Sequence, residues 1–552
     1  MTARQIEGEF ETVTEVLRAA AAVNADIEAY VEPATDGSSR RSLTFAEWDR
    51  AADGVAGLFA DHGVGPGTVV CLLLPSSIEY VVCYAAAVRL GAVTSGINLR
   101  LGAAEARSVL ERTRPTVTVV EDRAGAPSGP TGSLLALSAV RGAVDGPPPE
   151  VWPEVDRTDP VAVVWTSGTT GLPKGAVFDH ASLAAVADGT DVLSASGDRR
   201  LSPLPFAHVG SMTRPWDEIA NGVTTVITPT PWRAADAIRI MAEERITVGQ
   251  GVPTQWALVL SHPDLDAADV SSLRIAGTGA SRVPSELVAA MRDRLGVPVV
   301  VRYTSTEASL GTGTVPGDPD DVVATTVGRP VPGVTMAIVD EDGRTVPAGE
   351  VGRVRLSSAA VMRGYWGGPL AGPGAEGVVY DREATRAVLD DDRWLTTGDF
   401  GFTDAAGCLH LVGRANELYI RGGYNVYPAE VEGVLGAHPD VAQVAIVGAP
   451  DPVLGEIGVA FVVPTDAPAG DRSDLLETLR DLARSTLADY KAPDRLVVTD
   501  SLPLTSMMKV DKRSLADRAA LAARETPNRT GAARPVGANA DRRQPANGAP
   551  AP

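Results

Sequence analysis

Short apolar runs that suit buried strands alternate with amphipathic helical patterns over much of the chain. The alternation begins at about Leu43, continues to about Asp122, and resumes from the run 161–165 through about residue 300. In its first part, the strand-like runs and helical patterns lie at 68–74, 78–90, 103–113 and 116–121. Because alternating strands and helices form layered domains, this pattern predicts an α/β fold with a largely parallel sheet.

The second half of the chain departs from this alternation. From about Val322 to Gly413, turn signals at 340–343 and 404–407 separate short strand-like runs, which predicts a small antiparallel β subdomain. Beyond Arg414, shorter helical and strand-like stretches are mixed, and they lie at 428–436, 441–447, 459–463, 473–487 and 495–499. A small α+β domain of about a hundred residues is the natural interpretation.

Two segments lack periodic apolar patterns. Residues 123–158 are rich in Gly, Pro, Ser and Ala and predict a surface connection. The tail from about Glu525 has almost no large apolar residue, so burial cannot offset the entropy of ordering it. We therefore expect a large α/β domain over residues 1–413, a small α+β domain over 414–522 and a disordered tail over 523–552.

Composition narrows the classes of partner. With 552 residues and 44% hydrophobic residues, the chain can bury several cores. Its 70 acidic and 49 basic residues leave a formal charge of −21, which opposes the binding of nucleic acid. The same charge repels an anion such as ATP, so a nucleotide site needs its own local donors, cations and metal.

Cysteine and targeting signals are sparse. Cys71, Cys83 and Cys408 lie far apart, without a CxxC pair or a histidine at metal-ligand spacing, so we expect reduced, buried thiols. The N-terminal sequence is polar and acidic, and no apolar stretch approaches the ~18 residues that cross a bilayer. A cytoplasmic protein without a membrane span is the expectation.

One short loop carries the strongest chemical signal. Directly after the run 161–165 comes Thr-Ser-Gly-Thr-Thr-Gly-Leu-Pro-Lys-Gly, residues 166–175. Glycines let backbone amides turn inward, and the hydroxyls and the ammonium group of Lys174 add donors for a polyphosphate. The loop is not a Walker motif, because Pro173 replaces the required glycine and no Ser or Thr follows the lysine. A Ser- and Gly-rich turn without a ligand is the alternative.

This loop resembles the hallmark of the adenylate-forming superfamily, which includes acyl-CoA synthetases, carrier-protein adenylation domains and luciferases. The resemblance covers roughly residues 40 to 520 and includes further motifs in the family's order. These are LPFAHVG at 204–210, AGTGAS at 276–281, YTSTEA at 303–308, VGRPVPG at 327–333, WLTTGD at 394–399, GRANELYIRGGYNVYPAEVE at 413–432 and LPLTSMMKVDK at 502–512. The resemblance implies a large α/β domain with a mobile C-terminal lid, and an enzyme that joins a carboxylic acid to ATP as an acyl-adenylate.

The same resemblance implies how the phosphates are held. It assigns the β- and γ-phosphates of ATP to the loop residues Thr166, Ser167, Gly168, Thr169, Thr170, Gly171 and Lys174. Thr306 then contacts the α-phosphate, and Glu307 helps to place Mg²⁺, a cation that prefers carboxylate, water and phosphate oxygens. The alternative for Thr306 and Glu307 is a helix cap with an acidic first turn.

A second set of residues is implied at the nucleoside. Tyr303 matches the aromatic residue that stacks on adenine, and Gly279 and Ala280 let the backbone lie close to the ring. Asp399 is expected to accept hydrogen bonds from the ribose hydroxyls, with Arg414 beside the ribose. An ordinary core tyrosine, a turn aspartate and a surface arginine are the respective alternatives.

Lys509 and His208 are implied at the reacting groups. Lys509 matches the mobile lysine that bridges carboxylate and α-phosphate oxygens as negative charge shifts between them. Glycine usually precedes this lysine in the family, whereas Met508 stands here and resists positive φ. His208 matches a gate near the acyl site, with a capped or core histidine as the alternative; a solvated charge is the alternative for Lys509.

In the ligases of this superfamily, coenzyme A takes the acyl group in a second step. The lid turns about a hinge two residues past Arg414, which is Asn416 here where Asp or Lys is commoner. A Gly-rich loop then lines the pantetheine tunnel, and the small residues Gly422 and Gly423 are retained for it. An ordinary turn is the alternative for this pair.

Three functions fit these motifs. The first is an acyl-CoA ligase that uses ATP, Mg²⁺ and CoA on a mainly apolar carboxylic acid, either fatty, aryl, alicyclic or terpenoid. The second is a freestanding adenylating enzyme that passes the acyl group to a carrier protein or partner enzyme. The third is a non-catalytic nucleotide-binding scaffold, prompted by Met508 and Asn416. The acyl site is expected along 208–212, 277–279 and 309–313, and the sequence carries no signal of oligomeric state.

Overall fold

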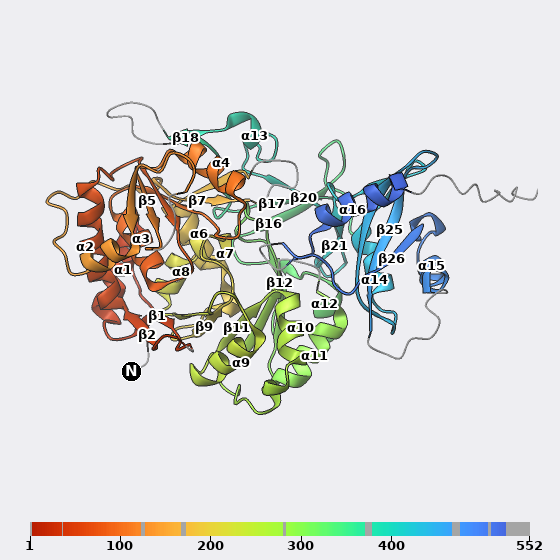
Figure 1. The fold of residues 1–552 in the computed structure, drawn as a ribbon, viewed down its shortest axis with the longest axis horizontal. Helices are drawn as coiled ribbons and strands as arrows, with labels where there is room; N and C mark the ends of the chain where they lie inside the picture. Colours follow the sequence, from red (N-terminus) through yellow and green to blue (C-terminus); the bar gives the residue numbers. More distant parts are fainter. Residues whose placement is uncertain are drawn as a thin grey trace, which may run out of the picture.

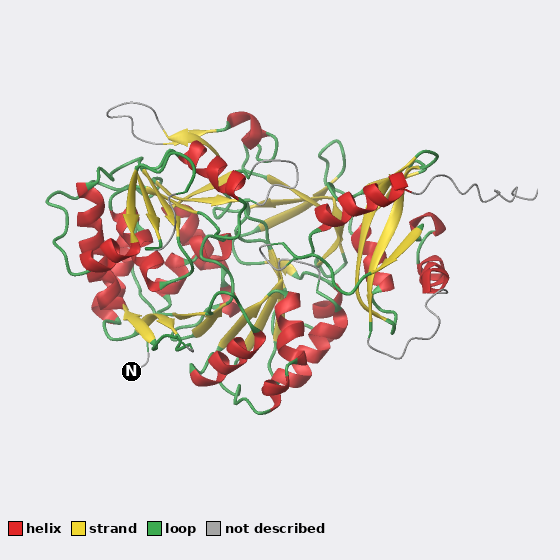
Figure 2. Cartoon of the chain, in the orientation of Figure 1, coloured by secondary structure: helices red, strands yellow, loops and turns green. Residues whose placement is uncertain are grey.

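Four β-sheets with their covering helices make up the fold (Figure 1). The computed structural model describes residues 3–35, 37–122, 127–166, 173–279, 283–369, 378–465, 475–505 and 509–525. An eight-stranded and a nine-stranded sheet fill the N-terminal part, and helices lie on their outer faces (Figure 2). A four-stranded sheet follows, and the C-terminal sheet lies beyond it at the far end of the molecule.

The eight-stranded sheet is mostly parallel. Its order is β19 (Val378–Tyr380), β18 (Gly364–Pro369), β8 (Gly175–Asp179), β7 (Pro160–Trp165), β4 (Val93–Gly96), β3 (Val69–Leu73), β5 (Val117–Val120) and β6 (Ser133–Ala136). On it pack α3 (Ile78–Arg89), α4 (Ala103–Thr113) and α5 (Leu137–Ala143), and α2 (Phe45–Asp61) packs on α3 and α5. The central strands are rich in valine and almost fully buried, as expected for a parallel sheet covered on both faces.

The nine-stranded sheet has a parallel centre and antiparallel edges. Its order is β15 (Arg329–Pro330), β14 (Thr312–Gly313), β13 (Val299–Tyr303), β12 (Ile275–Gly279), β11 (Val248–Gly251), β9 (Arg199–Ser202), β10 (Thr224–Ile227), β1 (Glu28–Glu32) and β2 (Arg41–Thr44). Its outer helices are α9 (Ala234–Glu243), α10 (Pro253–Ser261), α11 (Ser285–Leu295) and α12 (Asp320–Thr325), with the short turns η1 (Asp191–Leu193) and η2 (Pro263–Asp266). The helices α1 (Val13–Val23), α6 (His180–Gly189), α7 (Val209–Met212) and α8 (Pro215–Ala220) complete this part. Since α1 packs on both α2 and α8, it joins the two halves.

The antiparallel subdomain is narrower than its predicted span of 322–413. It contains β16 (Thr335–Val339), β17 (Gly352–Ser357), β20 (Leu395–Thr403) and β21 (Leu409–Arg414). The predicted span also includes α12 and β15, which belong to the nine-stranded sheet, and β18, β19 and α13 (Arg382–Arg386), which extend the eight-stranded one. Local turn signals do not reveal which sheet a strand joins, because that choice depends on distant partners.

The C-terminal sheet is covered on both faces. It contains β23 (Tyr424–Val426), β22 (Tyr419–Arg421), β25 (Gly455–Pro464), β24 (Val441–Asp451) and β26 (Arg495–Val498). Apolar residues of α14 (Pro428–Leu435) and α15 (Leu475–Thr486) form one core with the sheet, and those of α16 (Lys512–Glu525) form another. The short turn η4 (Asp489–Lys491) precedes β26. No helix in the described ranges is long and apolar enough to cross a membrane.

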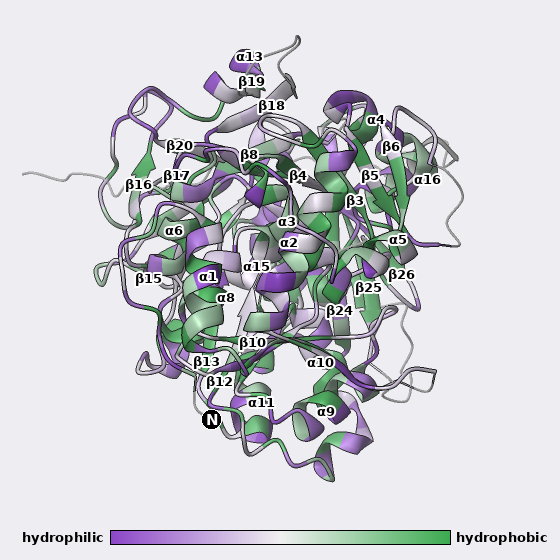
Figure 3. Cartoon of the chain, turned by 90° about the vertical axis from the view of Figure 1, so that its left-hand side faces the viewer, coloured by the Kyte–Doolittle hydropathy of each residue, from purple (hydrophilic) through white to green (hydrophobic). Residues whose placement is uncertain are grey.

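Most predicted elements are confirmed within one or two residues, and the helix over 103–113 has the predicted limits. The surface connection predicted over 123–158 is wrong in part, because this stretch contains β6 and α5. Residues 123–126 and the tail beyond residue 525 lie outside the described ranges. All three cysteines are free and buried, as predicted. Figure 3 shows the hydrophobic residues concentrated on the inner strands and on the inward sides of the helices.

Candidate active site

The predicted phosphate loop joins two antiparallel strands, β7 and β8. At its foot, the Thr166 amide donates to the Lys174 carbonyl over 2.8 Å, and the Lys174 amide donates to Oγ1 of Thr166 over 3.3 Å. These bonds place the lysine at the start of β8. The loop residues Ser167, Gly168, Thr169, Thr170 and Gly171 lie outside the described ranges.

A tyrosine that the sequence did not single out connects this lysine to Glu307. The Lys174 ammonium lies 5.1 Å from the ring centre of Tyr365. The Tyr365 hydroxyl donates to Oε1 of Glu307 over 2.7 Å, and burial together with that carboxylate raises the pKa of Tyr365. Tyr365 reaches this position because β18 pairs with β8, opposite Ala176. Its neighbours in the sequence, Gly364 and Trp366, are uncharged, so nothing in this stretch indicated a site residue.

Thr306 and Glu307 occupy one helical turn directly after β13. The Ser309 amide donates to the Ser305 carbonyl over 3.1 Å, and the Ala308 amide donates to Oγ of Ser305 over 3.2 Å. Ser305 therefore caps this turn, so the capping role considered for Thr306 is wrong. A carboxylate has about four acceptor positions, so Glu307 keeps capacity beyond its bond from Tyr365.

The predicted nucleoside residues converge on one carboxylate. Oδ2 of Asp399 accepts from the Tyr303 hydroxyl over 2.7 Å, and Oδ1 accepts from Nε of Arg414 over 3.0 Å. Asp399 and Arg414 are paired in the ladder of β20 and β21. Burial and the Asp399 charge raise the pKa of Tyr303. Burial lowers the pKa of Arg414, but the charges of Asp399 and Glu417 outweigh it and raise the pKa.

Backbone packing explains the glycine beside Tyr303. Gly279 ends β12, next to β13, and a Cβ there would lie 2.2 Å from the Arg302 carbonyl oxygen. Only glycine fits such an approach. Its predicted neighbour in the site, Ala280, lies outside the described ranges.

Lys509 reaches the same region from the C-terminal part. The Lys509 carbonyl accepts from the Thr505 amide over 2.7 Å, and a β-bridge joins Leu504 to Val510, so the lysine stands at the foot of a short loop. Burial and the positive charge of Arg414 lower the pKa of Lys509 to about 8, against the opposing effect of Asp399. Met507 and Met508 lie outside the described ranges.

His208 caps a short helix, and the charge of Lys509 affects its pKa. Its Nδ1 accepts from the Gly210 amide over 3.2 Å at the start of α7. Burial and the charge of Lys509 lower its pKa to about 3, so the ring is neutral at physiological pH. Because Nδ1 is the acceptor, the proton of the neutral ring is on Nε2.

The C-terminal part packs on the four-stranded sheet next to this group. The ring of Tyr427, which precedes α14, lies 5.6 Å from that of Phe400 on β20. Asn416 lies in the turn between β21 and β22. Gly422 and Gly423 form the tight turn between β22 and β23, with φ of +57° and +89°. Both glycines are exposed in this turn.

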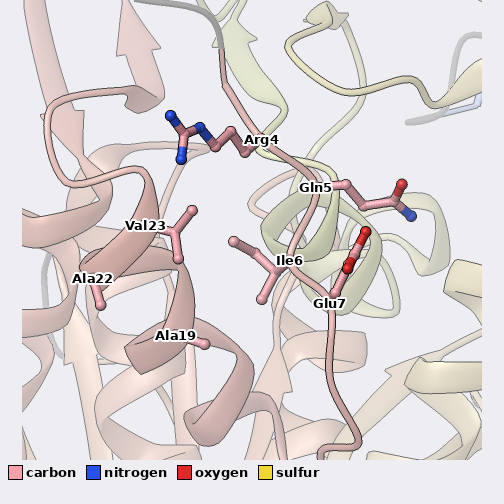
Figure 4. A pocket seen from close by; sticks show the side chains of 7 residues that line it. All are labelled: Arg4, Gln5, Ile6, Glu7, Ala19, Ala22 and Val23. Atoms are coloured by element: carbon pink, nitrogen blue, oxygen red, sulfur yellow. The ribbon is translucent and has the colours of Figure 1, made fainter.

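Two further features bear on cofactors and cavities. Within the described ranges, no cluster of three His, Cys, Asp or Glu side chains is arranged to hold a metal ion. One protein carboxylate combined with substrate phosphates and water is nevertheless a usual arrangement for Mg²⁺, and Glu307 fits it. A hollow of about 790 Å³ lies between α1 and the segment 4–7 (Figure 4), and none of the predicted site residues lines it.

The layered fold, the buried Tyr303 and Asp399, and the exposed Arg414 that is bonded to Asp399 agree with the resemblance to adenylate-forming enzymes. The family described as AMP-binding enzyme matches residues 17–366, and the AMP-binding enzyme C-terminal domain matches residues 430–509. The chain belongs to the AMP-binding enzyme family, within the adenylate-forming superfamily, and it is an AMP-forming acyl-CoA synthetase.

Named relatives agree with this class. Indoleacetate–CoA ligase of Aromatoleum aromaticum is 34% identical over 491 residues, which cover 86% of this chain and 92% of that protein. Fatty acid–[acyl-carrier-protein] ligase ScoC of Streptomyces coeruleorubidus is 31% identical, over 87% of this chain and 92% of that protein. The anthranilate CoA ligase AuaEII in complex with anthranoyl-AMP superposes with a TM-score of 0.80 at 27% identity, over 93% of this chain and 98% of that one.

Proposed function

We propose that this synthetase activates a bulky carboxylic acid at the group formed by Tyr303, Asp399, Arg414 and Lys509, and that CoA is the acyl acceptor. The convergence of these four residues carries the proposal. They come from β13, β20, β21 and the loop after Leu504, yet they share hydrogen bonds or charges. An ordinary core tyrosine, a turn aspartate, a surface arginine and a solvated lysine have no reason to meet.

In the proposed first step, a carboxylate oxygen of the acid attacks the α-phosphorus of ATP, and the bond to pyrophosphate breaks. Lys509 sits between the two anions and neutralises charge as it moves from one to the other. Thr306 contacts the α-phosphate, while the loop from Thr166 to Lys174 holds the β- and γ-phosphates. Bound Mg²⁺, held by Glu307, supplies further charge neutralisation to the phosphates.

In the second step, the sulfur of CoA attacks the acyl carbonyl carbon, AMP leaves, and the thiol proton passes to solvent. We propose that residues 414–522 form a lid that turns about Asn416 between the two steps. The turn at Gly422 and Gly423 then faces the pantetheine arm, and no side chain at either position obstructs it. Residues 1–413 hold ATP and the acid throughout, and His208 lies at the entrance to the acyl site.

A carrier protein is the second candidate for the acceptor. The relative ScoC, whose name specifies an acyl-carrier protein, favours it. An enzyme with either acceptor carries out the same first step, and the two differ only in the molecule that receives the acyl group in the second step. The non-catalytic scaffold has less support, because the charges of Lys509 and Asp399 act on each other across the two parts of the chain.

The acid is proposed to be aryl or alicyclic. Two of the similar proteins are named for aryl acids, indoleacetate and anthranilate. The cytoplasmic location stays a prediction from the sequence.

The test is an assay of purified protein with ATP, Mg²⁺ and a panel of aryl, alicyclic and fatty acids, with and without CoA. Mass spectrometry would follow acyl-AMP and acyl-CoA. We expect acyl-CoA from at least one bulky acid. Lys509→Ala should abolish acyl-AMP, whereas Lys491→Ala, at a lysine paired with Glu430, should not. Acyl-AMP that is unchanged by CoA would move the proposal to a carrier protein, and no product from any acid would overturn it.

A further inference from the structure

A partly buried arginine directly precedes the tyrosine proposed to stack on adenine. Arg302 and Tyr303 are neighbours on β13, so their side chains point to opposite faces of the sheet. Arg302 is paired with Gly279 on one side and with Gly313 on the other. Because directly paired residues share a face, the arginine has no side chain beside it on either neighbouring strand.

The guanidinium group lies against this bare part of the sheet. A Cβ at Gly313 would lie 1.6 Å from Nη1 of Arg302, so glycine leaves space for the arginine in this position. The Arg302 side chain is 18% exposed. This face of the sheet therefore holds a partly buried cation.

One donor of this cation is unused. Nη2 of Arg302 is buried and has no hydrogen-bond partner in the described part of the chain. The ion-pair partner, Asp191, has Oδ2 at 4.0 Å from Nη2, which is too far for a hydrogen bond. Burial lowers the pKa of Arg302 to about 10. The negative charge of Asp191 opposes this shift, and the positive charge of Arg214 adds to it. Since buried donors are nearly always paired, this one needs an explanation.

The position of this unused donor in the sheet explains why it has no partner in the protein. Gly279 and Gly313 belong to two of the segments predicted to line the acyl site, and Arg214 follows the third segment by two residues. Leu193, on the same face, packs within 3.2 Å of where a Cβ of Gly277 would lie. Arg302 therefore lies between two of the predicted lining segments, 277–279 and 309–313, on the face of β13 opposite Tyr303.

We propose that Arg302 is a specificity-determining residue that donates from Nη2 to an oxygen atom of the acid, remote from the carboxyl group that is activated. This inference rests on the proposed function. The acceptor is a carbonyl or a second carboxylate oxygen, both of which suit a guanidinium donor. The acid is then not simply apolar, as the sequence predicted, but carries one buried polar group at its distal end.

A purely structural ion pair with Asp191 is the competing explanation. It requires Arg302 and Asp191 to act together, with equal effects on every acid. Recognition of the substrate requires that loss of Arg302 affects only acids that carry the distal oxygen. The two explanations therefore differ in substrate preference, which a change in stability alone does not alter.

The experiment uses two matched sets of acids. One set is 3-cyclohexylpropanoic acid with its 4-oxo and 4-carboxy derivatives, and the other is 3-phenylpropanoic acid with its 4-acetyl and 4-carboxy derivatives. ATP–pyrophosphate exchange gives kcat/KM for each acid. In at least one set, we expect the wild-type chain to prefer an oxygen-bearing acid about tenfold or more, the size of a hydrogen bond to a charged group. Comparing the oxo and acetyl derivatives with the carboxy derivatives shows whether the hydrogen-bond acceptor is neutral or anionic.

Variants then assign the preference to a residue. Arg302→Met should reduce the preference for the oxygen-bearing acid to within about twofold of unity. Arg329→Met is the matched control, because Arg329 also pairs with Gly313 but has Asp318 at 2.9 Å, and its preference should match wild type. Asp191→Asn should keep the preference.

Each other outcome counts against the inference. If the plain acids are activated as well as the others, or if Arg302→Met keeps the preference, Arg302 does not recognise the acid, although adenylation stands. If Arg302→Met and Asp191→Asn lower all rates alike, the arginine is only the partner of Asp191. If no acid supports exchange, the proposed function itself fails, and the inference falls with it.

Discussion

The hydroxyl of Tyr365 donates a hydrogen bond to Oε1 of Glu307 over 2.7 Å, across 58 residues of sequence. The face of the same ring lies 5.1 Å from the ammonium group of Lys174. One tyrosine thus orients both the carboxylate proposed for Mg²⁺ and the lysine proposed for the terminal phosphates. The two contacts use different parts of the ring, so substitutions can separate them.

Removing only the hydroxyl should loosen Glu307. We expect Tyr365→Phe to raise the Mg²⁺ concentration needed for half-maximal adenylation several-fold and to lower kcat about tenfold, since a hydrogen bond to a charged group contributes about 1.5–3 kcal/mol. Tyr365→Leu also removes the ring under Lys174 and should raise the KM for ATP further. Magnesium titrations of pyrophosphate exchange measure both. Tyr380→Phe, on the neighbouring strand β19, is the control, and an equal effect there would contradict this role.

Substitution of Asp399 should reduce activity far more than substitution of Tyr303. In Asp399→Asn, an NH2 group replaces one of the two acceptor oxygens and faces a donor of Tyr303 or Arg414, and the charge opposite Arg414 is lost. We expect at least a hundredfold loss of kcat/KM for ATP and a lower stability, the latter limited because Arg414 is 45% exposed and solvent screens its pair with Asp399. Tyr303→Phe keeps the ring and should cost less than tenfold. Steady-state kinetics and urea unfolding test this, and similar losses for both variants would rule it out.

The depressed pKa of Lys509 predicts the pH dependence of the first step. Because its pKa is lowered to about 8, the lysine is mostly charged at pH 7 and mostly neutral at pH 9. The proposed role needs the charged form, so kcat/KM for adenylation should fall about tenfold per unit above pH 8. Lys509→Arg, which stays charged, should remove this fall while lowering the rate at pH 7. A profile of the wild type that is flat from pH 7 to 9.5 would be inconsistent with the role.

The same shift makes a prediction about stability. A lysine whose folded pKa lies below its unfolded value of about 10.4 disfavours the fold when it is charged in both states. This penalty is fully present below pH 8 and disappears as the pH rises towards 10.5. Lys509→Met should therefore be more stable than wild type at pH 7, and the difference should shrink by pH 10. Thermal unfolding at the two pH values measures it, and a less stable variant at pH 7 would contradict the prediction.

The turn at Gly423 should matter for CoA alone. At Gly423, φ is +89° and no other atom lies within 4 Å of the place where a Cβ would stand, so a side chain there causes backbone strain without a local clash. We expect Gly423→Val to slow thioester formation at least tenfold while pyrophosphate exchange stays within twofold. Gly407→Val is the matched control for backbone strain, because Gly407 has φ +78° and equally open surroundings. Equal losses in both variants would mean that strain, and not the acceptor, limits the second step.

The amino-acid sequence alone was enough to establish the fold class, the family and nearly every proposed site residue. Hydrophobic periodicity is local, so the helix at 103–113 and the strands β3, β5 and β7 could be predicted from it. Motifs such as the lysine loop and the Thr-Thr-Gly-Asp run are also local, because a phosphate or a ribose is held by a few adjacent groups.

The three-dimensional structure was needed to show which of these residues share a contact and which others join them. Tyr365 and Arg302 carry no signal of their own, because β18 pairs with β8 from a distant part of the chain and Arg302 acquires meaning from glycines on two other strands. The strand β6 and the helix α5 were likewise hidden in a segment of weak periodicity. Burial, an unused donor and a shared hydrogen bond are properties of partners distant in the chain, and a pattern along one stretch of sequence does not contain them.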